Sequence, residues 1–316
     1  MSLSVILQQM GVICILVAIG IYLQKKGVVD TLTSKKLSAI VVDVCNPALI
    51  MASILSGGIT ATHEDLLIAA ELGAAFYALL IILGFIIPRI LRAAPDKRRF
   101  YNLMTVYTNT GFLGIPVARA ILPANAILYV IVINIFYSLL FYTHGLTVLG
   151  KGKNADASVK TKNPLLNVIN PGTVMAILSL IVFWYKIELP PLVSNTIQYV
   201  GNATVFLSMA LLGVSIARSK IAESVKDARI WGYVALRMIL LPIVIVFVMK
   251  ALSFDPVATL AMCLMAAVPV GNLPMIQAEK IGEDTTILSS GVAVTTVVSI
   301  GTITILTSIF SAWLLG

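Results

Sequence analysis

Charged residues are scarce in this sequence: they make up 11% of its 316 residues, whereas a soluble globular domain carries roughly 25%. Hydrophobic residues make up 59%, which is more apolar surface than a water-soluble fold of this length can bury. The shortage of charge therefore excludes an ordinary soluble domain. We expect an all-α membrane protein whose apolar surface is covered by a lipid bilayer.

Cysteine and histidine are also rare. Cys14, Cys45 and Cys263 lie far apart inside apolar runs, and His63 and His144 are solitary. This spacing offers no CxxC pair and no set of metal ligands. The HExxH, GxSxG and Walker motifs are missing as well, so we expect neither an enzyme nor a cofactor. The net charge of +8 lies in short clusters between apolar runs, so nucleic acid is not an expected partner.

Ten apolar runs approach the roughly 20 residues that a helix needs to cross a bilayer. They are Val5–Leu23, Lys36–Leu55, Leu66–Ile90, Tyr101–Leu122, Ala126–Leu149, Pro171–Tyr185, Val193–Ala217, Ile230–Ala251, Val257–Glu279 and Ile287–Leu315. The first run is followed by Lys25 and Lys26 and lacks a small-residue cleavage site. We therefore interpret it as a retained first helix rather than a signal peptide.

The basic residues predict the orientation of these runs. Eighteen of the 22 lysines and arginines fall in the loops after the first, third, fifth, seventh and ninth runs. Loops rich in lysine and arginine stay in the cytoplasm. The sequence therefore predicts a multi-pass protein of the cell membrane with both termini outside.

The two halves of the chain follow the same plan. Residues 1–150 and 163–316 each hold five runs, and residues 151–162 form a short polar linker that the charge rule assigns to the cytoplasm. A repeat with an odd number of helices inserts upside down relative to its copy. Aligning Pro116 with Pro274 gives an offset of 158 residues, and nearly the same offset lays Asp43 over Asn202. The sequence thus predicts two inverted five-helix repeats.

Glycine and proline interrupt the fourth and ninth runs at matching positions. The fourth run contains Asn109-Thr110-Gly111 followed by Pro116, and the ninth contains Gly271-Asn272-Leu273-Pro274. One such motif is typical of a plain proline kink. A matched pair in inverted halves indicates two broken helices at a substrate site, as in secondary transporters. The N-terminal ends of broken helices carry about half a positive charge each, which suits a carboxylate.

Ionisable side chains inside a membrane helix are functional candidates by default. For Asp43 two readings stay open: a role in proton or substrate handling, or a structural hydrogen bond. For Arg237 we favour a structural role, either in capping backbone carbonyls or in pairing with an acid. The neutral amides either donate to a bound carboxylate or hold helices together. They are Asn46, Asn109, Asn134, Asn202, Asn272 and Gln277.

These motifs resemble the auxin efflux carrier family, which includes plant exporters and many bacterial carriers. The resemblance covers essentially the whole chain. Its most specific parts run from Asn109 to Pro116, from Ala266 to Pro274 and from Ile287 to Gly291, with Asn46-Pro47 in support. Plant exporters carry Asn-Pro-Asn where this chain has Asn170-Pro171-Gly172. That departure argues against auxin itself as the substrate.

The resemblance implies a fold related to sodium/proton antiporters and bile-acid carriers. Helices 1, 2, 6 and 7 would form a scaffold, often dimeric, and helices 3–5 and 8–10 a moving transport domain with crossed, broken helices 4 and 9. It implies an elevator-like transport of organic anions. Asn109 matches the family's asparagine beside the substrate, Asn46 faces the pocket, and Pro116 and Pro274 match the crossover prolines.

We therefore expect a secondary transporter of a small organic anion. The expected substrate-binding residues are Asn46, Asn109, Thr110, Gly271, Asn272 and Gln277. One alternative is a proton- or sodium-coupled carboxylate carrier that uses Asp43 as its coupling site. Another is a membrane sensor that binds a metabolite without moving it, although the short loops leave no room for a signalling domain.

Overall fold

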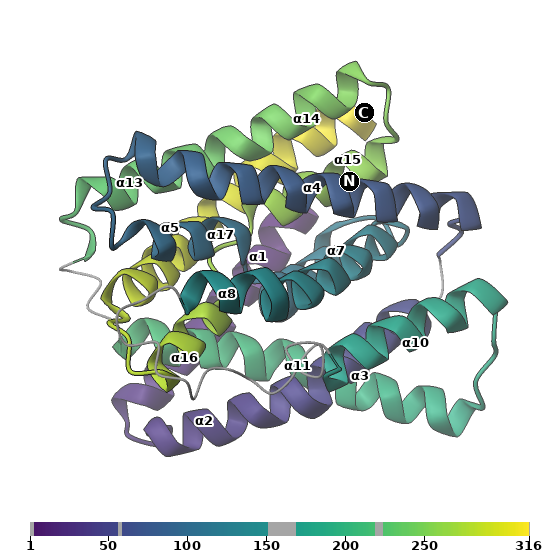
Figure 1. The fold of residues 1–316 in the computed structure, drawn as a ribbon. Helices are drawn as coiled ribbons and strands as arrows, with labels where there is room; N and C mark the ends of the chain where they lie inside the picture. Colours follow the sequence, from purple (N-terminus) through teal and green to yellow (C-terminus); the bar gives the residue numbers. More distant parts are fainter. Residues whose placement is uncertain (1–2, 56–58, 151–168, 219–223, 316) are drawn as a thin grey trace.

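The structure, a computed structural model, describes residues 3–55, 59–150, 169–218 and 224–315, and helices dominate these ranges (Figure 1). The helices, with π-helical segments written η, are α1 (Leu3–Lys25), α2 (Thr31–Ile40), η1 (Val41–Cys45), α3 (Asn46–Leu55), α4 (His63–Ile90), α5 (Arg98–Val106), η2 (Thr110–Gly114), α6 (Ile115–Ile121), α7 (Ala126–Leu140), η3 (Phe141–Gly145), α8 (Leu146–Leu149), α10 (Pro171–Tyr185), α11 (Pro191–Arg218), α13 (Ala228–Val234), η5 (Ala235–Leu240), α14 (Leu241–Ala251), α15 (Pro256–Ala267), α16 (Asn272–Lys280) and α17 (Thr286–Leu315). The expected linker, residues 151–162, lies outside the described residues.

Counting continuous α and π segments together, seven helices in the described ranges are long and apolar enough to cross a membrane. The prediction of an all-α, multi-pass membrane protein is therefore confirmed. Three of the ten expected runs correspond instead to shorter apolar helices, namely Thr110–Ile121, Pro171–Tyr185 and Pro256–Ala267. Two of these three belong to the interrupted runs.

Several helices begin before the apolar runs that predicted them, because polar side chains cap their first turns. The second run was expected to start at Lys36, but α2 begins at Thr31, where the Asp30 carboxylate accepts a 2.7 Å hydrogen bond from the Thr33 amide. Thr62 and Asp65 form a reciprocal capping box at the start of α4. Lys35 and Lys36 therefore lie inside α2 rather than in a loop.

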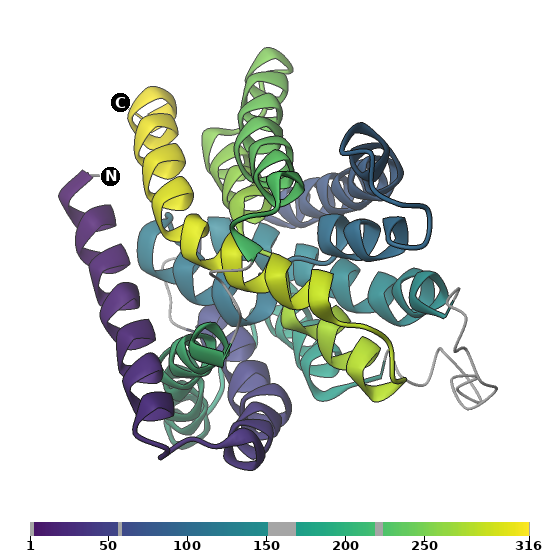
Figure 2. The same ribbon diagram turned by 90° about the vertical axis from the view of Figure 1, so that its left-hand side faces the viewer.

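The helices pack into two sets (Figures 1 and 2). In the first set, α11 packs against α1 and α3, and α3 against α10. In the second set, α4 packs against α5 and α7, and α15 against α7, α14 and α17. Figure 2 shows the free ends of α1 and α17 on the same side of the molecule.

Glycine allows the closest helix contact in the first set. A Cβ atom added to Gly213 of α11 would lie 2.0 Å from the carbonyl oxygen of Val17 in α1. A Cβ atom added to Gly20 of α1 would lie 2.0 Å from the carbonyl oxygen of Ala210. The two backbones therefore touch directly, as small residues permit in membrane helices.

Candidate functional site

The two interrupted helices meet at their breaks. Helix α5 ends at Val106, and the chain is not helical again until η2 begins at Thr110. Helix α15 ends at Ala267, and α16 begins at Asn272. Between these ends Thr108 and Val270 form an isolated antiparallel β-bridge, so each break supplies backbone partners to the other.

Two backbone hydrogen bonds flank this bridge, and we call the region around them the crossing (Tyr107–Asn109 with Val268–Gly271). The Asn109 amide donates to the Pro269 carbonyl at 2.8 Å, and the Gly271 amide donates to the Tyr107 carbonyl at 3.0 Å. Lipid offers no partners to broken backbone, so such breaks persist only where protein or a wet cavity satisfies them. Here each broken helix provides hydrogen-bond partners for unpaired backbone groups of the other.

Arg237 closes the crossing from one side. It lies in η5, and only 1% of its surface is exposed. Its Nε donates to the Thr105 carbonyl at 3.0 Å, and its Nη1 donates to the Ala266 carbonyl. Both carbonyls belong to the last turns of α5 and α15, where carbonyls lack partners within the helix. Of the two structural roles expected for Arg237, the structure shows the capping of carbonyls, and no described acid lies within ion-pair distance of it.

Polar side chains from three segments gather where η2 begins. The hydroxyl of Thr110 donates to Oδ1 of Asn134 in α7 at 3.0 Å, and both residues are buried. A Cβ atom added to Gly111 would lie 3.3 Å from Nδ2 of Asn46 and 3.6 Å from Oδ1 of Asn134. The structure thus brings the expected residues Asn46 and Thr110 together, and it adds Asn134 as a partner of Thr110.

Asn109 is 5% exposed and caps η2, because its Oδ1 accepts a 3.2 Å hydrogen bond from the Phe112 amide. No hydrogen bond among the described residues uses its NH2 group. The buried Oδ1 atoms of Asn46 and Asn272 have no hydrogen-bond partner among the described residues. Unsatisfied buried polar atoms of this kind are uncommon in folded proteins and call for a role.

The remaining expected residues lie at different distances from the crossing. Gly271 is part of it, whereas Gln277 lies farther along α16 and is half-buried. Pro116 lies in the first turn of α6, directly after η2, and Pro274 lies in the first turn of α16. The proline at the crossing itself is Pro269, through its carbonyl. A non-helical proline directly after an apolar helix was the available sequence signal for it.

Asp43 lies in η1, three residues before Asn46, and its side chain is exposed on the described surface. Its carboxylate acts electrostatically on the phenol of Tyr142 in η3. No described hydrogen bond joins Asp43 to Asn109. Asp43 therefore lies next to the polar side chains around Asn46 and is not part of the crossing.

His144 contacts the crossing, which its isolation in the sequence did not suggest. Its Nδ1 lies 2.8 Å from the hydroxyl of Tyr107, and that hydroxyl also donates to the Leu140 carbonyl at 2.9 Å. Tyr107 is fully buried and accepts the Gly271 amide with its backbone. His144 thus connects η3 to the crossing through one side chain.

The π-helical segments coincide with these polar residues. Asp43 lies in η1, Thr110 in η2, His144 in η3 and Arg237 in η5. A π-helical turn inserts an extra residue into a helix and frequently marks a functional site. No motif in the amino-acid sequence predicted these turns.

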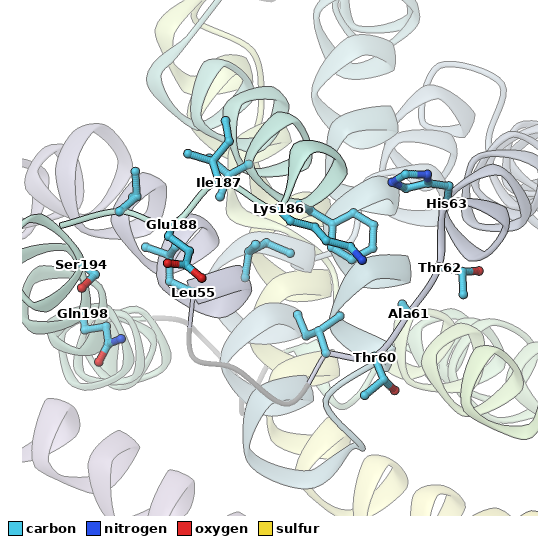
Figure 3. A pocket seen from close by; sticks show the side chains of 15 residues that line it. Leu55, Thr60, Ala61, Thr62, His63, Lys186, Ile187, Glu188, Ser194 and Gln198 are labelled. Carbon is cyan, nitrogen blue, oxygen red and sulfur yellow. The ribbon is translucent and has the colours of Figure 1, made fainter. Parts of the chain in front are cut away.

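A cavity of about 720 Å³ lies apart from the crossing, between the ends of α3 and α10, the start of α11 and the segment leading into α4 (Figure 3). Figure 3 shows His63 and Lys186 on one side of it, with Glu188, Ser194 and Gln198 on the other. His63 stacks on Trp184 with ring centroids 3.9 Å apart, and its Nε2 lies 2.9 Å from the Trp184 carbonyl. The cavity thus lies where the two helix sets meet.

Within the described ranges, no three histidine, cysteine, aspartate or glutamate side chains gather as a metal site would require.

Comparison with known proteins finds a matching family model and a relative of similar length. A family model described as membrane transport protein matches residues 5–307. An uncharacterized transporter of Methanocaldococcus jannaschii is 22% identical over 302 residues, covering 92% of this chain and 94% of the relative. Both matches extend across the two helix sets and the crossing.

Proposed function

The chain belongs to the membrane transport protein family, that of the auxin efflux carriers, and from this premise we propose that it is a secondary carrier of a small organic anion. The observation that carries the proposal is the crossing. There the N-terminal ends of η2 and α16 follow directly after the breaks, beside the amides of Asn109 and Asn272. Helix N-termini and amide donors favour a carboxylate.

We assign substrate binding to Asn46, Asn109, Thr110, Gly271, Asn272 and Gln277, with Pro116 and Pro274 holding the half-helices that follow the breaks. The buried, unsatisfied Oδ1 atoms of Asn46 and Asn272 support this assignment. A carboxylate accepts hydrogen bonds only, so it pairs with amide NH2 groups, while those two oxygens suit a hydroxyl or N–H elsewhere on the substrate. The favoured substrate therefore carries a carboxylate and a hydrogen-bond donor.

For the mechanism we propose ten membrane spans in two inverted repeats, residues 1–150 and 163–316, both termini outside and the chain acting as a homodimer. The antiparallel pairing of the two broken helices supports an inverted relationship between the halves. The first helix set would be the scaffold, and the second would carry the crossing past it. The division of the packing into two sets supports an elevator-like movement.

A second candidate is a proton- or sodium-coupled carboxylate carrier in which Asp43 is the coupling site. The exposure of Asp43, three residues before Asn46, favours it. A charged side chain inside a membrane span commonly marks an ion or proton pathway.

Reconstitution separates these candidates. The protein in liposomes is given radiolabelled mono- and dicarboxylates, with and without proton and sodium gradients. The carrier proposal predicts saturable uptake of at least one anion. Binding without uptake would instead identify a sensor, and uptake that ignores both gradients would rule out coupling through Asp43.

A further inference from the structure

The crossing brings four helix ends together, and their partial charges can be counted. Each helix terminus carries about half an elementary charge, negative at the C-terminal end and positive at the N-terminal end. Helices α5 and α15 end at the crossing, and η2 and α16 begin there. The two C-terminal ends therefore carry about one negative charge together, and the two N-terminal ends carry about one positive charge together, inside the membrane.

The Arg237 guanidinium lies at the negative pair. It donates to Thr105 in the last turn of α5 and to Ala266 in the last turn of α15. One guanidinium matches the negative charge of two helix C-termini. The polar groups that act electrostatically on it are the phenols of Tyr233 and Tyr77, which are neutral when protonated. Within the described ranges the buried polar and charged residues include no aspartate or glutamate.

Backbone carbonyls at a helix C-terminus are also the ligands that a metal cation would use in such a break. At this crossing the side chain already binds those of Thr105 and Ala266. Arginine suits the position because its planar fork presents several donors and stays charged even when buried. A lysine ammonium is a single point charge and is less suited to bind two fixed carbonyls at once.

We propose that Arg237 is a resident cation that takes the place of a co-transported metal cation at the crossing. It neutralises the negative helix ends permanently and leaves the positive ends of η2 and α16 for the substrate anion. The inference rests on the proposed function for its role in transport. Its consequence is that the crossing is complete without sodium or potassium, and that the charge selected by the site is negative.

The test uses thermal stability, so it needs no identified substrate. The purified protein in detergent is melted in choline, sodium and potassium chloride, and its Tm is followed by tryptophan fluorescence. Wild type should show the same Tm in all three salts. Arg237→Gln should lose several degrees in Tm and regain part of the loss in millimolar guanidinium chloride, far below denaturing concentrations, because the small cation can enter the vacated position.

Two further variants make the result specific. Arg119→Gln removes a half-buried arginine of α6 whose described hydrogen bond goes to the Asn202 side chain at 3.5 Å and not to a backbone carbonyl, so guanidinium should not raise its Tm. Arg237→Lys keeps the charge and should not respond to sodium or guanidinium. It also provides the comparison if Arg237→Gln does not fold.

Stabilisation of wild type by sodium or potassium over choline that persists in Asp43→Asn would overturn the inference, as would an Arg237→Gln variant that guanidinium does not stabilise. Arg237→Lys responding to either cation would do the same. These outcomes are independent of transport: if no organic anion is carried, the proposed function fails while the melting data still decide the role of Arg237.

Discussion

The backbone amide of Asn109 donates a 2.8 Å hydrogen bond to the carbonyl of Pro269, across 160 residues of chain. This bond makes the two broken helices one structural unit, because the partner that each break lacks within its own helix is supplied by the other. The Gly271 amide likewise donates a 3.0 Å hydrogen bond to the Tyr107 carbonyl. A change on either side of the crossing should therefore affect both helices.

Gly271→Ala should weaken this unit. The added Cβ would lie 3.0 Å from the Thr108 carbonyl oxygen and 3.1 Å from that of Tyr107. These are backbone atoms of the bridge itself, so the crossing must open slightly, at a cost of about 1 kcal/mol if one hydrogen bond is lost. We expect a lower Tm and weaker anion uptake.

Gly301→Ala is the matched control. Gly301 lies within α17, and nothing lies within 4 Å of the position its Cβ would take. Alanine should stabilise the helix there by up to about 1 kcal/mol. If both variants change Tm alike, the close approach at Gly271 is not what matters.

Gly213→Ala should destabilise the first helix set. Its Cβ would lie 2.0 Å from the Val17 carbonyl oxygen and 2.9 Å from the Ile21 amide nitrogen, both backbone atoms of α1. Overpacking typically costs about 1–3 kcal/mol. Gly11→Ala in α1 meets nothing within 4 Å and should leave the Tm unchanged or raised. An unaltered Tm for Gly213→Ala would contradict the direct contact of α1 with α11.

Glu283→Gln should lower the Tm because it removes the acid of an ion pair that is largely shielded from solvent. Arg99 in α5 contacts the two carboxylate oxygens of Glu283 at 2.6 and 3.1 Å, and their side chains are 16% and 8% exposed. We expect a loss of about 1.5–3 kcal/mol, typical of hydrogen bonds to charged groups.

Arg229→Gln is the comparison for that variant. Arg229 approaches Asp227 only at 4.0 Å, and both side chains are about half exposed. Exposed pairs contribute about 0–1 kcal/mol, so its Tm should barely change. Equal losses of Tm in the two variants would show that the Arg99–Glu283 pair contributes no more to stability than an exposed pair.

Cross-linking the two helix sets beside the cavity of Figure 3 should block transport. His63 begins α4 in the second helix set, and Trp184 lies near the end of α10 in the first. Their rings are 3.9 Å apart, so cysteines at both positions, in a background lacking Cys14, Cys45 and Cys263, should react with a short bis-maleimide. If the two sets slide past each other, the linked protein cannot carry anion.

The control is a link within the first set. Arg218 of α11 donates to Gln24 of α1 at 2.8 Å, so cysteines at these positions should also link. Transport should continue because both helices belong to the same set. Loss of uptake in both linked proteins, or in neither, would argue against the sliding movement.

The sequence predicted the membrane class and the interrupted helices because both depend on local composition. Apolar runs mark the helices, and Gly271 with Pro274 marks a break. The position of the first break was shifted: the motif pointed to Asn109–Pro116, whereas the chain leaves the helix at Tyr107–Asn109. The cause is tertiary, since Tyr107 and Asn109 leave the helix to pair with Gly271 and Pro269.

The contacts of Arg237 and His144 were less accessible to sequence reasoning. Arg237 reaches residues 132 and 29 positions away, and His144 reaches Tyr107 across 37 residues. The register that brings them to the crossing depends on the π-helical turns η5 and η3. Each turn shifts the faces of its helix by one residue, and composition does not reveal that shift.

The most direct test of the account compares anion uptake by wild type with uptake by two variants of Asn109 in the same liposomes. Asn109→Ala removes both the amide NH2 group and the cap of η2, whereas Asn109→Ser keeps a capping oxygen and loses the NH2 group. We predict saturable uptake of an organic anion by wild type, and its loss in both variants while Asn109→Ser retains the wild-type Tm. Unchanged uptake by Asn109→Ser and Asn109→Ala would contradict an anion site at the crossing.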